Sequence, residues 1–180
     1  YNPILLGGLH NLHGIKAPAF IPAKAKHMIR DCKLIAERNK TKFKFNSYFP
    51  IRSLNLMRGV LVAEEDNIKS YYIDSIFNTI WQDGLNMNDD NIVQKVLKNL
   101  NVNPKTFALR ATSSSIKDSL KIKTSEAYEK GIFGAPTFIS NNNVGKNTIY
   151  YRFTLYLNFL YTKISIIKIG VTPRSLEIRP

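Results

Sequence analysis

Apolar residues recur with the period of an α-helix along most of the chain between residues 23 and 130. From Ser53 to Asp66, for example, Leu54, Met57 and Leu61 follow one another every three or four residues, and Ser53 is a plausible N-cap. Similar spacing predicts further helices over residues 23–39, 68–84, 89–101, 103–113 and 114–130. The segments from residue 53 onward follow one another with no predicted strand between them.

Residues with strong preferences for helix ends mark several of these boundaries. The acidic pair Asp89-Asp90 suits a helix N-terminus, and Pro104 suits a first helical turn. Gly84 is a predicted stop, and Gly131 is expected at the C′ position after the last long helix. Local sequence therefore predicts both the order and the approximate limits of the helices.

Two stretches are expected to be strands. In "KFKFNSYFP", lysine and phenylalanine alternate, which predicts an exposed or edge strand from Thr41 to Tyr48, ended by Pro50. The second stretch is "PTFIS", which follows Pro136. Residues 1–22 are rich in glycine and proline and are predicted to be a loop with short turns. Helices clustered between two strands indicate an α/β fold with an all-helical insertion at about residues 53–113.

Composition narrows the classes of partner. The 180 residues suffice for one domain with a core, and the formal net charge is +13. This charge permits binding to nucleic acid or to an acidic membrane, but the lysines are dispersed, with no block of five or six. The nearest cluster, Asn39 to Phe45, alternates Lys with Phe, which fits a strand with one wet face better than a track for phosphates. We therefore expect no nucleic acid partner.

The single cysteine and the histidines offer little chemistry. Cys32 excludes an internal disulfide, a Cys-based zinc site and a CxxC redox pair. It lies in an apolar-periodic stretch, where a buried, inert thiol is favoured over a nucleophile. His10 and His13 lack a third ligand at metal-binding spacing, so we predict no metal site.

Residues 141–180 differ in character from the rest of the chain and are interpreted as a divergent basic, aromatic tail. This tail has no acidic residue before Glu177. The stretch from Thr148 to Ile169 is long enough to span a bilayer, but Arg152, Lys163 and Lys168 oppose insertion, so we expect no membrane span. A frameshift or read-through is one hypothesis for the tail. The N-terminus lacks an initiator Met and a basic n-region, which suggests a fragment without a signal peptide.

Four blocks of sequence, in order and at consistent spacing, resemble a known family. They are "PILLGGLHNLHGIKAPAFIPAKAKHMIRDCK", "FKFNSYFPIRSLNLMRGVL", "IFNTIWQDGLNMND" and "LKIKTSEAYEKGIFGAPTF", across residues 3–140. The chain resembles the 2-hydroxychromene-2-carboxylate isomerases and the kappa-class glutathione transferases, within the DsbA-like thioredoxin superfamily. The resemblance implies a DsbA-like thioredoxin domain over residues 1–140, with its first strand and helix missing from the printed chain.

The resemblance also implies a chemistry. In the family, glutathione is the cofactor, and its thiolate adds to a small aromatic or hydrophobic substrate, allows rotation about a carbon–carbon bond, and leaves. A serine near the family's N-terminus assists the thiolate, and no serine here can be given that role. We therefore expect weak or no isomerase activity from this chain. The resemblance further implies a cytoplasmic protein and allows a homodimer.

Four residues match family positions near the ligands. Lys24 matches a lysine near the glutathione carboxylates, although a solvated first-turn lysine is an equal alternative. Asn46 matches a polar residue near the substrate, and an asparagine that ends a strand is the alternative. Ala135 matches the residue whose backbone pairs with the glutathione cysteinyl group. Pro136 matches the family's cis-proline, which we favour over a trans proline at a strand start.

One departure and two competing functions stand beside this reading. Ile15 occupies the position of a family asparagine that contacts glutathione, and its side chain cannot form that hydrogen bond. A DsbA-like thiol oxidoreductase would need Cys32 as a thiolate, far from the proline loop. A basic binding protein, or a remnant without enzymatic activity, is the other alternative, motivated by the net charge and the tail.

Overall fold

The structure is a computed structural model that describes residues 1–141 and 147–151. Helices dominate this part of the chain, and a single pair of strands follows them. The elements are α1 (Leu6–Leu12), the 3₁₀ helix η1 (Pro18–Phe20), α2 (Pro22–Arg38), α3 (Leu54–Glu65), α4 (Lys69–Trp81), α5 (Asp90–Asn99), α6 (Pro104–Ala111), α7 (Ser114–Glu129), β1 (Thr137–Asn141) and β2 (Asn147–Tyr151).

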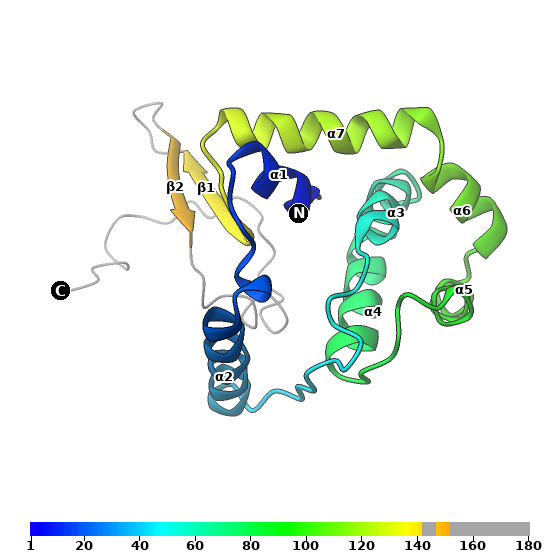
Figure 1. The fold of residues 1–180 in the computed structure, drawn as a ribbon. Coiled ribbons are helices and arrows are strands. Elements are labelled where there is room, and N and C mark those ends of the chain that lie inside the picture. The colour runs from blue at the N-terminus through cyan, green and yellow to red at the C-terminus, as the bar shows by residue number, and fades with distance from the viewer. Residues whose placement is uncertain (142–146, 152–180) are drawn as a thin grey trace.

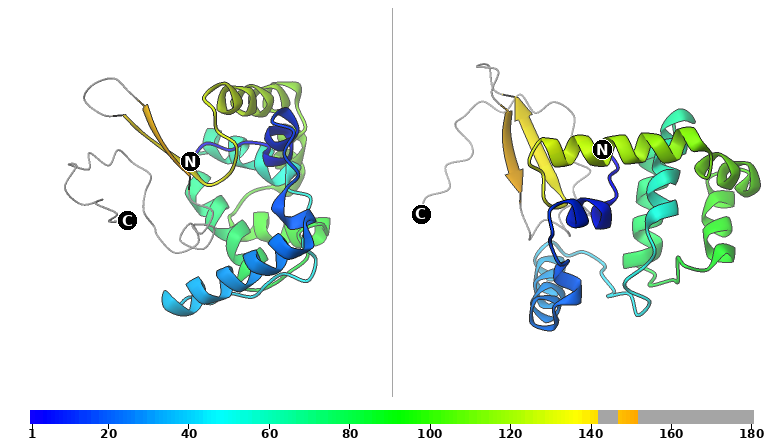
Figure 2. Two further views of the ribbon diagram at one scale, coloured as in Figure 1. Left: turned by 60° about the vertical axis from the view of Figure 1, so that its left-hand side comes forward. Right: turned by 45° about the horizontal axis from the view of Figure 1, so that its top comes forward.

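The long helix α7 connects two parts of the fold (Figure 1). At its N-terminal end it contacts α3 and α6, and α4 and α5 complete this helical group. Towards its C-terminal end it contacts α1, and the chain then passes into β1. Helix α2 follows η1 and lies apart from the helical group in Figure 1 and in the right view of Figure 2.

The main core lies among α3 to α7. Tyr72 and Val62 are among its most deeply buried side chains, and Tyr72 donates a hydrogen bond to the Leu56 carbonyl at 3.3 Å. Gly59 faces the Tyr72 ring so closely that an added Cβ would lie 2.1 Å from the phenolic oxygen. Glycine is therefore required where α3 passes α4. The remaining buried members are Leu56, Val60, Leu61, Ala63, Ile76, Ile80, Trp81, Met87, Val96, Leu97, Phe107, Ala111, Ile116 and Leu120.

Local signals placed the helices well. The Asp89 carboxylate accepts from the Asn91 N–H at 2.8 Å, and Asn103 caps α6, which has Pro104 in its first turn. Gly131 follows α7 with a φ of 72°, as expected of a C′ glycine. Ser53 does occupy the N-cap position of α3, but its side chain makes no capping hydrogen bond.

The prediction of a strand from Thr41 to Tyr48 is wrong. This segment has no regular secondary structure, turns at Ser47 and Tyr48, and pairs with no strand in the described part of the chain. Phe43 and Phe45 lie with their ring centroids 6.0 Å and 6.1 Å from that of Trp81. Lys44 is exposed, and its N–H donates to the Trp81 carbonyl at 2.6 Å. The alternation of lysine and phenylalanine shows only that one face of the segment is buried. Here the end of α4, and not a neighbouring strand, packs against that face.

The prediction that residues 1–22 form a loop is also wrong in part, because α1 lies within them. Its two glycines disfavour a helix, but Leu9 is fully buried. The N–H of Leu5 donates to the Thr124 hydroxyl of α7 at 3.0 Å. Tertiary contacts thus outweigh the weak local propensity. Gly14, with a φ of 64°, follows the end of the helix.

β1 and β2 form an antiparallel pair in the described part of the chain, with Thr137 opposite Tyr151 and Asn141 opposite Asn147. The predicted strand "PTFIS" is thus confirmed. β2 falls in the segment that the sequence assigned to the tail, whereas residues 142–146 and 152–180 lie outside the described residues. Within the described residues, no helix has the length and apolar character needed to cross a membrane.

Candidate functional site

The candidate site is the loop between α7 and β1, which contains Ala135 and Pro136. The predicted cis bond between these two residues is present. A second cis bond, Phe49–Pro50, was not predicted. Both residues of the loop pair are half-buried and lie at the mouth of β1.

Two side chains hold carbonyl groups of this loop. His13 Nε2 lies 2.8 Å from the Ile132 carbonyl oxygen, and the Thr137 hydroxyl donates to the Gly134 carbonyl at 2.7 Å. The N–H of Ile132 donates to the Ala127 carbonyl of α7 at 3.0 Å. Among the described residues, no hydrogen bond occupies the N–H or the C=O of Ala135. This residue can therefore offer one donor and one acceptor to an extended ligand.

Lys24 lies in the first turn of α2, exposed to solvent. With Pro18, Ala23 and His27 it lines a shallow, largely apolar hollow of about 430 Å³. Within the described residues, its ammonium group forms no ion pair or hydrogen bond, so its charge is available to an anion. The structure shows no direct bond between Lys24 and the Ala135 loop, and its role in binding a carboxylate stays a prediction.

Asn46 has a clear structural task. Its side chain is completely buried. The amide group donates to the carbonyls of Ile80 and Leu85, each at 2.9 Å, and its oxygen accepts from the Tyr48 N–H at 2.8 Å. The first two bonds tie the segment around Asn46 to the end of α4 and to the loop that follows it, and the third lies within the segment. A substrate would have to displace them, so the predicted substrate contact has no support from this geometry and stays a prediction.

Cys32 lacks the surroundings of a reactive thiol. It is partly buried on α2, and burial, with a smaller contribution from Asp31, raises the pKa of its thiol to about 11. A thiol with such a pKa carries almost no thiolate at neutral pH. This argues against the oxidoreductase alternative as far as Cys32 is concerned.

His10 and His13 lie on and just after α1. His10 is buried, and this burial, with a smaller effect of His13, lowers its pKa. The described residues include no group of three possible metal ligands. Sequence reasoning missed the contact between His13 and Ile132 because 119 residues separate the two, and no local pattern signals it.

A second hollow, of about 340 Å³, lies in the helical group between Ile68 and Arg110. Among the described residues that line it, Arg110 is the one cation, and its guanidinium binds Asp66 and Glu65 at 2.7 Å each. These hydrogen bonds raise the pKa of Arg110. The described lining therefore offers no free charged group that could select a ligand.

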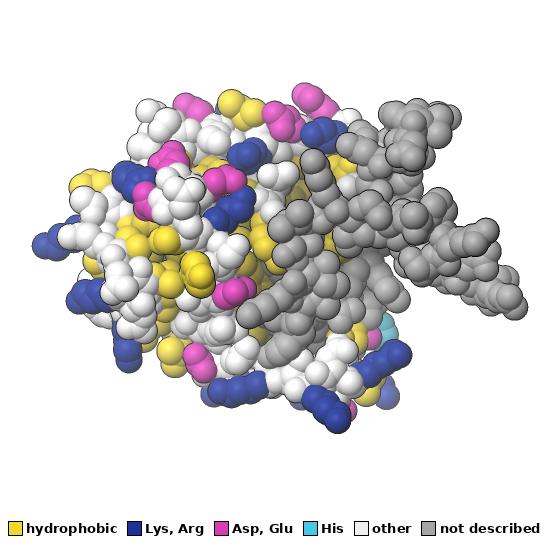
Figure 3. Space-filling view, turned by 180° about the vertical axis from the view of Figure 1, so that it is seen from behind, with side chains coloured by type: hydrophobic (Ala, Val, Ile, Leu, Met, Phe, Trp, Pro, Cys, Tyr) yellow, Lys and Arg dark blue, Asp and Glu magenta, His cyan; other side chains and the backbone are white. Residues whose placement is uncertain are grey.

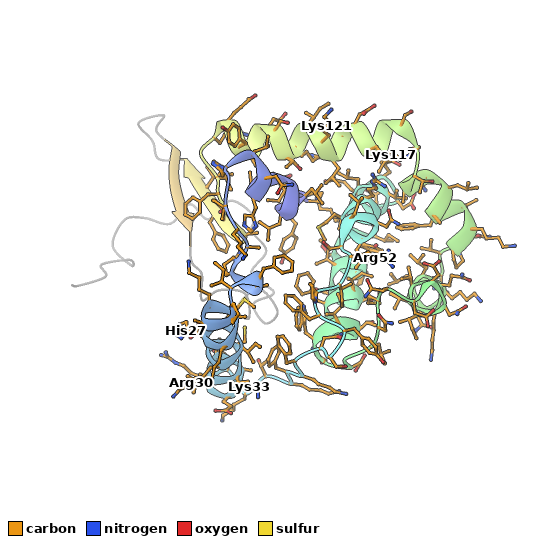
Figure 4. The ribbon with its side chains drawn as sticks, viewed as in Figure 1. His27, Arg30, Lys33, Arg52, Lys117 and Lys121 are labelled. Atoms are coloured by element: carbon orange, nitrogen blue, oxygen red, sulfur yellow. The ribbon has the colours of Figure 1, made fainter. Side chains whose placement is uncertain are left out.

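In the described part of the chain, exposed basic side chains are spread over several elements. Those labelled in Figure 4 are His27, Arg30 and Lys33 on α2, Arg52 ahead of α3, and Lys117 and Lys121 on α7. On the face seen in Figure 3, lysine and arginine side chains are scattered, with acidic groups among them. This distribution offers no continuous track for a nucleic acid backbone there, and the absence of such a partner stays a prediction.

Comparison with known proteins agrees with this architecture. No curated protein matches the chain. A solved structure described as selenomethionine 2-hydroxychromene-2-carboxylate isomerase is similar to it, with a TM-score of 0.73 and 17% sequence identity over 88% of this chain and 76% of that one. At this identity the likeness shows a shared fold, which is the DsbA-like thioredoxin fold with inserted helices. Residues 1–150 match the family described as the DSBA-like thioredoxin domain, and the chain belongs to that family.

Proposed function

We propose that this protein binds glutathione and belongs to the glutathione-dependent isomerases that act on small aromatic substrates. The observation that carries the proposal is the unoccupied backbone of Ala135, whose N–H and C=O have no partner among the described residues. A residue in that state can exchange two hydrogen bonds with one residue of an extended peptide, as in an antiparallel pair. Glutathione is a peptide that can present its cysteinyl residue in this way.

Two further observations support the choice of ligand. Lys24 supplies a positive charge that forms no ion pair within the described residues, and this charge suits the carboxylates of glutathione. The solved structure with the same fold is described as an isomerase of 2-hydroxychromene-2-carboxylate, which suggests the substrate class. The substrate, the glutathione dependence and a cytoplasmic location are parts of this proposal, and the expectation of weak turnover stays a prediction.

The test is a thermal-shift titration with reduced glutathione at millimolar concentrations. Because a ligand that binds only the folded state stabilises it, we expect the Tm to rise with ligand concentration. The control ligand is 2-mercaptoethanol, which has the thiol but no peptide backbone, and it should give no rise. Equal effects of both compounds, or no effect of glutathione, would contradict the proposal.

A pair of lysine variants tests the charge. Lys24→Ala should weaken glutathione binding, whereas Lys26→Ala should leave it unchanged. Both lysines are exposed on α2, but two helical positions turn their side chains apart by about 200°. Turnover is then measured with 2-hydroxychromene-2-carboxylate, with and without glutathione, by the change in ultraviolet absorbance. Isomerisation that proceeds equally without glutathione would contradict the proposed mechanism.

A further inference from the structure

A histidine far away in sequence holds the loop that carries Ala135. His13 Nε2 lies 2.8 Å from the Ile132 carbonyl oxygen. A carbonyl can only accept, so Nε2 carries the proton in this contact. Ile132 is three residues before Ala135, and its N–H is bonded to the end of α7. Both the N–H and the C=O of Ile132 are therefore fixed by hydrogen bonds.

His13 is itself held in place by α1 and α7. The backbone N–H of His13 donates to the Leu9 carbonyl at 3.2 Å, and the Leu9 side chain is fully buried. Its ring lies against the Tyr128 ring of α7, with centroids 4.5 Å apart and planes tilted by 53°. The imidazole therefore has little freedom to leave the Ile132 carbonyl.

On the other side of the loop, the Thr137 hydroxyl fixes the Gly134 carbonyl. The two side chains thus engage the carbonyls at positions 132 and 134 and leave the backbone of Ala135 without a partner in the described residues. We propose that His13 is a positioning residue for the ligand site, which fixes the Ile132 carbonyl so that the Ala135 N–H and C=O face the ligand. This inference rests on the proposed function.

A purely structural role of His13 predicts a different result. If the imidazole only attaches α1 to α7, its loss lowers stability but leaves the affinity of the folded protein unchanged. Thr124→Val is a matched control, because the Thr124 hydroxyl accepts from the Leu5 N–H and donates to the Leu120 carbonyl, and no hydrogen bond among the described residues joins it to the loop. It should lower the Tm and leave glutathione affinity within about twofold of the unmodified chain.

The experiment is calorimetric titration of reduced glutathione, at a temperature where every variant is folded. We expect His13→Ala to raise the Kd about tenfold, because the loop loses the side-chain hydrogen bond that holds the Ile132 carbonyl. His13→Gln, which retains an N–H donor on a side chain of similar reach, should restore most of the affinity. An unchanged Kd in His13→Ala, or an equal loss in Thr124→Val, overturns the proposal.

Amide hydrogen exchange in the unliganded protein separates this inference from the proposed function. His13→Ala should speed exchange at Gly131 and Ile132, whose N–H groups donate to the Tyr128 and Ala127 carbonyls, more than Thr124→Val does, and His13→Gln should reverse the effect. If the unmodified chain binds no glutathione but this pattern appears, the proposed function fails and the positioning of the loop stands. Equal exchange at these amides in His13→Ala and Thr124→Val overturns the positioning role whether or not glutathione binds.

Discussion

The contact of Gly59 with Tyr72 makes a quantitative test of the packing between α3 and α4. In an exposed helix interior, Gly→Ala stabilises a protein by about 0.5–1 kcal/mol. At Gly59 the new Cβ would lie 2.1 Å from Tyr72 Oη, 2.7 Å from Cζ and 3.1 Å from Phe107 Cε1. The ring, which is 2% exposed, has no free space beside it, so it must shift or the two helices must separate.

The magnitude follows from two costs. Overpacking a core residue costs about 1–3 kcal/mol, and leaving the buried Tyr72 hydroxyl without the Leu56 carbonyl costs about 1–3 kcal/mol more. After subtraction of the gain in helix propensity, Gly59→Ala should lower the free energy of unfolding by about 1–5 kcal/mol. Urea unfolding followed by the fluorescence of Trp81, the single tryptophan, measures this directly.

Two controls make the test decisive. Gly7→Ala, in α1, places its Cβ where no atom lies within 4 Å, so it should be neutral or stabilising by up to about 1 kcal/mol. Tyr72→Phe removes the nearest atom, so it should make Gly59→Ala less costly, although Cζ still crowds the site. If Gly59→Ala is as stable as the unmodified chain, the reasoning about this contact is refuted.

Three further predictions concern single side chains. Asn46→Asp should lower the free energy of unfolding by about 2–4 kcal/mol, because a carboxylate cannot donate to the Ile80 and Leu85 carbonyls. An unchanged urea unfolding curve would contradict this prediction. Cys32 should react slowly with iodoacetamide at neutral pH and fast after denaturation, since its thiol pKa is raised to about 11; fast labelling of the folded protein would contradict this. Burial lowers the pKa of His10 in the folded state, so the unfolded state binds a proton at higher pH and stability should fall as the pH drops below about 6.5. Urea unfolding across pH measures this loss, which should be smaller in His10→Asn.

The helices could be predicted because their signals are local. The Asn103 side chain caps α6 through the N–H groups of Lys105 and Thr106, two and three residues away. Gly131 likewise ends α7 through its own backbone conformation. Such interactions are contained in a few consecutive residues, so a single sequence displays them.

The environment of the site could not be predicted in the same way. The bonds from His13 to Ile132 and from Leu5 to Thr124 each join residues 119 positions apart. The alternation around Phe43 and Phe45 correctly indicated one covered face, but it could not show that a tryptophan at the end of α4 covers it. Sequence pattern specifies which side of a segment is buried, whereas the fold decides which element buries it.

Helix α7 holds the helical group of α3 to α6 at a fixed orientation relative to α1 and the loop of Ala135. Ile116 and Leu120 belong to the helical core, whereas Thr124 accepts from the Leu5 N–H just before α1, and Ala127 accepts from the Ile132 N–H next to the candidate site. One residue inserted between Leu120 and Thr124 would rotate one region against the other by about 100°. The loops that join α3 to α6 can thus change length without moving Ala135, while the middle of α7 tolerates neither gain nor loss of a residue.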